Sequence, residues 1–231
     1  MKLTENDKYT IPRAMLDEIV RFESGEYIVN DDRAIIVRID GRYKCLVEDI
    51  NDFPKFARKF GINGLVCILC APINTPKIIG FEANAVKTYA YTDPMPPAVN
   101  LPDGVEIKRL APTLAQTVKD RYHNPGDYSV QTIAELMRDK GIFGAIKGGR
   151  LAGFIGRHPE GDMGMLEVYE QFRRQGIGSA LERFLINFIM TFGRMPVCDV
   201  YLDNEPSINL QQNIGMTAAP DYTFWGEYVN R

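Results

Sequence analysis

The sequence predicts a mixed α/β fold built in two parts, and three observations lead to this expectation. Helical and strand-like apolar patterns alternate along the 231 residues. Hairpin signals precede a strand–helix–strand unit, which favours a mixed, mostly antiparallel twisted sheet flanked by helices. The segment YTDPMPPAVNLPDG at 91–104 holds four prolines, which prevent both helix continuation and central-strand pairing. We therefore expect a smaller α/β domain at residues 1–92, a linker at 93–102 and a second domain at 103–231.

In the first part, apolar spacing predicts a helix over 9–23, with Pro12 near its start. Two β-rich runs over 33–49 meet at Asp40-Gly41, which is a strong hairpin signal. The remaining elements expected here are a helix at 53–62, a buried strand at 64–72 and an alternating strand at 85–92.

The second part opens with a predicted strand at 105–112 and continues with further elements up to the last aromatic strand. Lys147 to Arg150 form the turn of a predicted hairpin over 142–158. Apolar residues on one face predict an amphipathic helix from Gly176 to Gly193. The other elements are helices at 114–122, 130–141 and 205–215 and strands at 163–169, 195–203 and 222–230.

The composition is typical of a soluble globular protein, with 45% hydrophobic residues, 25% charged residues and a net charge of −3. Lysines and arginines are scattered, so no nucleic-acid partner is expected. The polar start MKLTENDKYT lacks a secretory signal, and no apolar run approaches the roughly 18 residues of a spanning helix. We therefore expect a cytoplasmic protein without a membrane partner, and the sequence leaves a homodimer open.

Four cysteines, Cys45, Cys67, Cys70 and Cys198, are too few and too scattered for a disulfide framework. Cys67 and Cys70 form a C-x-x-C spacing inside GLVCILCAP, but their neighbours are aliphatic and no second pair follows. Two buried strand cysteines are the preferred interpretation, and no metal is expected.

The stretch QFRRQGIGSA at 171–180 places a G-x-G turn where a strand leads into a helix. A glycine-rich helix start offers unpaired N–H groups and the positive end of the helix dipole, which favour a phosphate. A P-loop would need Lys after Gly178, and a Rossmann fingerprint would need a third glycine where Leu181 stands. The residues alone leave open a different phosphate loop or a helix start that merely tolerates glycine.

The segment LEVYEQFRRQGIGSALERFL resembles the acyl-CoA-binding segment of the GNAT superfamily of N-acetyltransferases. Arg173 to Gly178 match its Gln/Arg-x-x-Gly-x-Gly/Ala signature, and Val168 stands eight residues before the first glycine. A second family segment matches DNEPSINLQQNIGM through Asn204, Ser207, Leu210, Gly215 and Met216. The overall arrangement is similar to glycine N-acyltransferase-like proteins, whose first half is a divergent GNAT-like domain. The resemblance thus implies a GNAT-like fold, with a first half that binds no CoA.

The resemblance also implies which residues bind acetyl-CoA or another acyl-CoA as co-substrate. The backbone of the strand before the loop would pair with the pantetheine arm, and loop N–H groups would hold the pyrophosphate. The residues implied are Leu166, Glu167, Val168, Arg173, Arg174, Gln175, Gly176, Ile177, Gly178, Ser179, Asn204, Ser207 and Gln211.

The implied reaction is direct attack of a primary amine of a small substrate on the thioester carbonyl, which requires a base and an acid. Glu167 and Asp199 are the base candidates. Many family members carry a Tyr seven residues after the motif Asn, where this sequence has Gln211. Three alternatives follow: another Tyr such as Tyr222 supplies the proton, solvent supplies it, or the thiolate leaves unaided. The alternatives are a catalytically silent CoA sensor or partner-binding module, and an unrelated phosphate binder.

Overall fold

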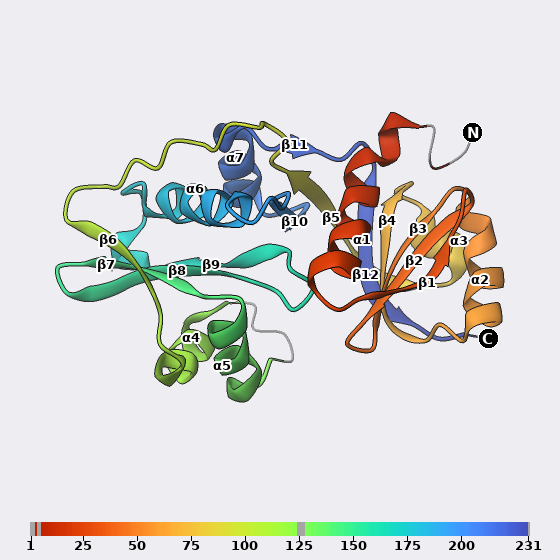
Figure 1. Cartoon of the computed structure of the whole chain (residues 1–231), viewed down its shortest axis with the longest axis horizontal. Helices are drawn as coiled ribbons and strands as arrows, with labels where there is room; N and C mark the ends of the chain where they lie inside the picture. The colour runs from red at the N-terminus through yellow and green to blue at the C-terminus, as the bar shows by residue number, and fades with distance from the viewer. Residues whose placement is uncertain (1–2, 4–5, 124–127, 231) are drawn as a thin grey trace. The chain divides into compact units, whose positions relative to one another are not determined.

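The computed structural model describes residues 3, 6–123 and 128–230 (Figure 1). The chain falls into two compact units, Met1–Ala90 with Val197–Arg231 and Tyr91–Pro196. The predicted mixed α/β fold with a mostly antiparallel sheet flanked by helices is confirmed.

The first unit contains a sheet in the order β1-β2-β3-β4-β12-β5-β10, with β11 paired to β5. Only β3 and β4 run parallel among the pairs of its described strands. The predicted hairpin turn is confirmed by Asp40 and Gly41, whose φ angles of 47° and 73° suit a tight two-residue turn. The strands are β1 (Glu26–Asn30), β2 (Ala34–Ile39), β3 (Arg42–Val47), β4 (Gly64–Ala71), β5 (Glu82–Ala90), β10 (Val197–Tyr201), β11 (Thr217–Ala218) and β12 (Tyr222–Tyr228).

This packing differs from the predicted division of the chain at residues 93–102. The segment from residue 197 onward packs with the first part of the chain, because β10 pairs with β5 and β12 pairs with both β4 and β5. The predicted boundaries, which concern the two GNAT-like halves, stay a prediction.

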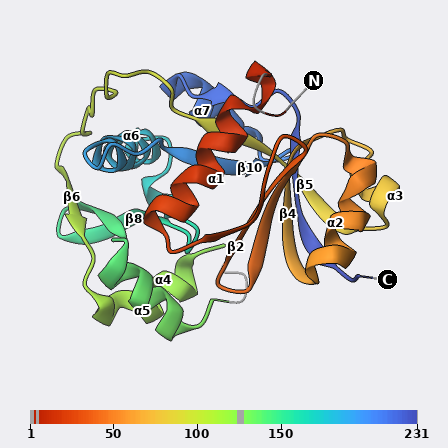
Figure 2. The same ribbon diagram turned by 45° about the vertical axis from the view of Figure 1, so that its right-hand side comes forward.

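The helices of the first unit cover both faces of its sheet, as Figure 2 shows for α1 and for α2 with α3. Phe53 and Ala57 of α2 and Ile79 of α3 join one apolar core with alternate residues of β2, β3 and β4. The opposite face carries α1, where Ile19 approaches Val37 beside Gly25. The helices are α1 (Thr10–Phe22), α2 (Phe53–Phe60), α3 (Thr75–Ile79) and α7 (Glu205–Ile214).

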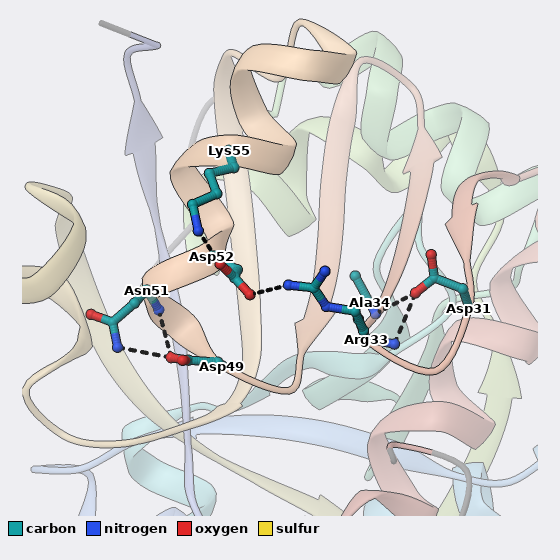
Figure 3. A network of polar contacts seen from close by, with 7 residues as sticks. All are labelled: Asp31, Arg33, Ala34, Asp49, Asn51, Asp52 and Lys55. Atoms are coloured by element: carbon teal, nitrogen blue, oxygen red, sulfur yellow. Dashed lines mark hydrogen bonds and ion pairs between the residues drawn. The ribbon is translucent and has the colours of Figure 1, made fainter. Parts of the chain in front are cut away.

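A polar network ties the β1–β2 turn to the start of α2 (Figure 3). Arg33 donates to one oxygen of Asp52 at 2.5 Å, and Lys55 reaches the other oxygen at 2.7 Å. Asp31 accepts from the backbone N–H groups of Arg33 and Ala34. Asp31 thus satisfies backbone N–H groups of the turn, and Asp52 holds two cationic side chains at the start of α2.

The second unit contains the antiparallel sheet β9-β8-β7-β6. Figure 1 shows α6 along one face of this sheet and α4 with α5 along the other. Phe143 of β7 meets Phe184 and Phe188 of α6, while Phe154 and Met165 join the core under α4 and α5. The elements are β6 (Val105–Arg109), α4 (Ala115–Arg121), α5 (Val130–Asp139), β7 (Phe143–Lys147), β8 (Arg150–Arg157), β9 (Met163–Val168) and α6 (Ile177–Met190).

The cysteines agree with the interpretation made from their spacing. All four are free and buried, and Cys67 and Cys70 lie on β4. Burial raises the pKa of the Cys45 thiol, which keeps that side chain in its neutral form. Within residues 6–123 and 128–230, no helix is long and apolar enough to cross a bilayer.

Candidate functional site

Strand β9 is irregular just before the glycine loop. Glu167 pairs with Phe154 and Gly164 pairs with Gly156, so two residues of β9 face one residue of β8. Met165, one of those two, has a φ of 53°, which is uncommon for a residue with a side chain. A bulge of this kind re-aims backbone groups and occurs often beside active sites.

Gly153 brings β8 close to β9 at the same point. A Cβ atom added to Gly153 would lie 2.4 Å from the carbonyl oxygen of Glu167 and 3.0 Å from Cα of Val168. Only glycine allows this approach, so Gly153 fixes the position of the peptide between Glu167 and Val168.

Strand alternation sends Glu167 and Val168 to opposite faces of the sheet. Glu167 shares the face of Phe154, which belongs to the core under α4 and α5. Val168 faces the start of α6, because a Cβ atom on Gly178 would lie 3.6 Å from its Cγ2. The backbone of β9 therefore connects a buried carboxylate to the glycine loop.

The loop from Arg174 to Ser179 presents a row of free backbone N–H groups. Arg174 and Gly176 have φ angles of 61° and 77°. No described residue accepts a hydrogen bond from the N–H groups of residues 174–179, and Ala180 donates the first bond of the helix, to Gly176. Gly176 is exposed, with only Pro102 near the place of a Cβ atom, at 3.6 Å. Such a cradle at the start of a long helix suits a phosphate or pyrophosphate.

Polar side chains surround this cradle. Nζ of Lys147, the last residue of β7, lies 2.5 Å from Oε1 of Gln175, and Gln175 also donates to the carbonyl oxygen of Gln171. The hydroxyl of Ser179 accepts a hydrogen bond from Arg183 at 3.3 Å. Arg173 donates from Nε to the carbonyl oxygen of Val168, and its Nη2 lies 3.5 Å from Oε1 of Glu167.

Glu167 is buried and has a second partner, His123, which the sequence did not indicate. Nδ1 of His123 contacts Oε2 of Glu167, and the His123 backbone N–H points to the same oxygen at 3.4 Å. The Glu167 side chain is 8% exposed, whereas the His123 side chain is 74% exposed. His123 follows α4, and the one available signal was that the chain has only two histidines.

Tyr169 lies two residues after Glu167 and on the same face of the sheet. Its hydroxyl oxygen is buried and has no hydrogen-bond partner among the described residues, while Arg121 lies over its ring at 5.3 Å. Burial raises the pKa of Tyr169, and the charge of Glu167 adds to the increase.

The structure gives Asp199, a predicted base, two hydrogen-bond partners within the first unit. Thr88 of β5 donates to Oδ1 at 2.6 Å, and the indole of Trp225 on β12 donates to Oδ2 at 2.9 Å. The buried Thr88 hydroxyl also pairs with Thr223 at 2.7 Å. These bonds hold the carboxylate between neighbouring strands.

Tyr222, the predicted acid, and Asp199 point to opposite faces of the sheet in the first unit. Its ring packs with Phe224 against the core under α2 and α3, and Lys87 lies over it at 5.1 Å. Asp199 lies on the face of Trp225, which alternates with Phe224 along β12. The structure therefore does not bring these two candidates together.

The remaining predicted cofactor residues belong to α7. Asn204 is the N-cap of this helix, and its Oδ1 accepts from the N–H of Ser207 at 3.2 Å. Gln211, at the position where a Tyr was expected, is buried. Asn204 is exposed and Ser207 is half-buried.

Comparison with known proteins agrees with the resemblance found in the motif residues. Residues 140–225 match a family described as FR47-like protein. A GCN5-related N-acetyltransferase from Kribbella flavida is 12% identical with a TM-score of 0.64, and the match covers 97% of this chain and 97% of that chain. A Drosophila protein is 18% identical with a TM-score of 0.66, covering 85% of this chain and 74% of that one.

A GNAT-family acetyltransferase from Colwellia psychrerythraea is 15% identical with a TM-score of 0.54, and the match covers 98% of this chain and 96% of that chain. None of the curated proteins matches the chain. The predicted likeness to the GNAT superfamily is confirmed, and the likeness to glycine N-acyltransferase-like proteins stays a prediction. The chain therefore has the fold of the GCN5-related N-acetyltransferases, and its residues 140–225 form an FR47-like segment.

Proposed function

We propose that the protein transfers an acyl group from an acyl-CoA thioester to a primary amine. The observation that carries this proposal is the row of free N–H groups at residues 174–179, which follows an irregular strand inside the FR47-like segment. Backbone N–H groups at a helix start bind the phosphates of a ligand without help from a metal.

The residues around the loop fit such a ligand. Gly176 and Gly178 carry no side chain that would cover the backbone N–H groups. Among the described residues, a Cβ atom on Gly176 would contact only Pro102, and one on Gly178 would contact only Val168, each at 3.6 Å. Lys147 and Arg173 add positive charge beside the cradle. The thioester would supply an activated acyl carbonyl, and the irregular stretch of β9 would hold the arm of the ligand by backbone groups.

Glu167 is our candidate for the general base. Its carboxylate is buried at the bulge, one residue before the strand ends. An amine attacks only as the free base, so a carboxylate that takes up the ammonium proton accelerates the reaction. Glu167 is preferred to Asp199, because both oxygens of Asp199 already accept hydrogen bonds from strand neighbours.

A CoA-binding sensor without catalysis is the second candidate function. Gln211 favours it, since an amide at that position cannot donate a proton as a phenol does. A transferase with Gln211 at this position would depend on Tyr222 or on solvent to protonate the departing thiolate.

One experiment separates the two functions. Acetyl-CoA would be incubated with purified protein and a panel of amino acids, polyamines and aryl amines, and release of free thiol would be followed. Calorimetric titration with acetyl-CoA would run in parallel. Turnover with any amine supports the transferase, binding without turnover across the panel supports the sensor, and absence of binding contradicts both.

A further inference from the structure

The carboxylate of Glu167 has a different neighbour on each side. Oε2 faces the ring and the backbone N–H of His123, and Oε1 faces the guanidinium of Arg173. The hydroxyl of Tyr169 lies on the same face of the sheet and is buried. A proton that Glu167 takes up must leave through one of these groups or through water.

Two of the three groups are poor carriers of a proton. A guanidinium has no site that accepts a proton, so Arg173 cannot take one from Glu167. The hydroxyl of Tyr169 is buried, no residue in the described part of the chain bonds to it, and burial raises its pKa. An imidazole can both accept and release a proton near neutral pH.

The ring of His123 contacts both a buried carboxylate and the solvent. Its Nδ1 touches a side chain that is 8% exposed, while its own side chain is 74% exposed. Such a ring can receive a proton at one nitrogen and lose one to water from the other.

We propose that His123 relays the proton from Glu167 to bulk solvent; this inference rests on the proposed acyl transfer. The acceptor ammonium loses a proton to the Glu167 carboxylate, which leaves a neutral amine and a carboxylic acid. The exposed ring exchanges its proton with water between Nδ1 and Nε2, and in the tautomer with bare Nδ1 it accepts the acid proton at Nδ1, which gives imidazolium and restores the carboxylate. The imidazolium then releases one proton to water, and exchange at the exposed ring restores the tautomer for the next turnover.

The other histidine provides an internal control. Nδ1 of His158 forms a hydrogen bond with the hydroxyl of Tyr128 at 2.9 Å, and its ring lies against Gly164. The surroundings of His158 therefore differ from those of His123. Because the chain has only two histidines, a ¹⁵N-histidine-labelled sample gives two ring spectra, and His158→Gln assigns them.

The first test asks whether His123 and Glu167 are paired in solution. Glu167→Gln should change the ring nitrogen resonances and the tautomer of His123 and leave those of His158 unchanged. Unchanged His123 resonances in this variant would overturn the relay, even where wild-type protein binds acetyl-CoA normally.

The second test asks whether the ring moves protons. With the fastest amine of the panel and a dilute buffer, His123→Ala should lower kcat about tenfold or more while KM changes little. Added imidazole should restore kcat in proportion to its concentration, and His158→Gln should show no such rescue. A loss of kcat that imidazole does not restore, or no loss at all, would overturn the relay. Lack of acetyl-CoA binding by the wild type would instead refute the proposed function, and the relay with it.

Discussion

Nε of Arg173 donates a hydrogen bond to the carbonyl oxygen of Val168 at 2.9 Å, so the first residue of the glycine motif folds back onto the strand before it. The same guanidinium lies 3.5 Å from the Glu167 carboxylate. A ligand that used the Val168 carbonyl, or drew Arg173 toward its phosphates, would break these contacts. Under the proposed function, donor binding and the contacts of the candidate base would therefore be linked through the side chain of Arg173.

Replacing Arg173 with Met should weaken acetyl-CoA binding about tenfold or more. A charge-assisted hydrogen bond to a phosphate contributes about 1.5–3 kcal/mol, and Met removes it while keeping a long apolar stem. The measurement is calorimetric titration at two salt concentrations. Arg58→Met, on the exposed side of α2, is the matched control and should bind as the wild type does. Equal affinities for the two variants would contradict a phosphate role for Arg173.

Gly176→Val should abolish acetyl-CoA binding. Gly193→Val is its control, because Gly193 has a φ of 66°, close to the 77° of Gly176, and nothing lies near either Cβ position closer than 3.6 Å. Both variants should lose at least about 1–2 kcal/mol of stability from the left-handed backbone. Thermal unfolding would show this shared loss, while calorimetry should show lost binding only for Gly176→Val. Retained binding in Gly176→Val would contradict the proposal that the loop at residues 174–179 binds acetyl-CoA.

Asp199→Asn should reduce stability more than it reduces turnover. An amide is uncharged and accepts at only one of its two polar atoms, so the bonds to Thr88 and Trp225 lose their charge assistance. The Thr88 hydroxyl must also turn to accept from the amide and donate to Thr223, at a total cost of about 1–2 kcal/mol. Denaturant unfolding and kcat of the same preparation provide the comparison. A hundredfold fall in kcat with unchanged stability would make Asp199, and not Glu167, the base.

The Asp52 network should make stability depend on pH in the acid range. Lys55 first and Arg33 second hold the pKa of the Asp52 carboxyl below its usual range. A lowered pKa stabilises the folded protein above the unfolded-state value of about 4, and this contribution is lost as pH falls through the folded pKa. Asp52→Asn should thus lower the Tm near pH 6 and lower it progressively less as the pH falls below about 4. Asp203→Asn, at an exposed position before α7, should show no such pattern.

Gly164→Ala should destabilise the β8–β9 hairpin by about 1–3 kcal/mol through overpacking. A Cβ atom there would lie 2.1 Å from Nε2 of His158, so the imidazole must leave its place beside Tyr128. The double variant Gly164→Ala/His158→Ala tests this cause, since removal of the ring should recover part of the loss. An additive double variant would contradict it.

The sequence predicts most of the helices and strands because their patterns are local. Short elements escape: α3 spans only Thr75–Ile79, and β1 carries a weak alternation. The pairing of β12 with β4 and β5 could not be read either, because it joins residues about 140–160 positions apart.

The candidate site divides in the same way. The glycine loop was predictable, because its chemistry lies in consecutive residues. The contact between His123 and Glu167 joins positions 44 residues apart, and the partners of Asp199 come from two other strands. The φ of Met165 is set by strand register and leaves no mark in the residue type.

The place of β12 between β4 and β5 has a consequence for biosynthesis. Residues 1–90 are synthesised well before β12. The sheet that they begin lacks its strand between β4 and β5 until residue 228 has been made. Until then β4 and β5 each expose an unpaired edge that could join a foreign strand. The first unit can therefore complete its sheet only after β12 has been synthesised, more than 130 residues after β5.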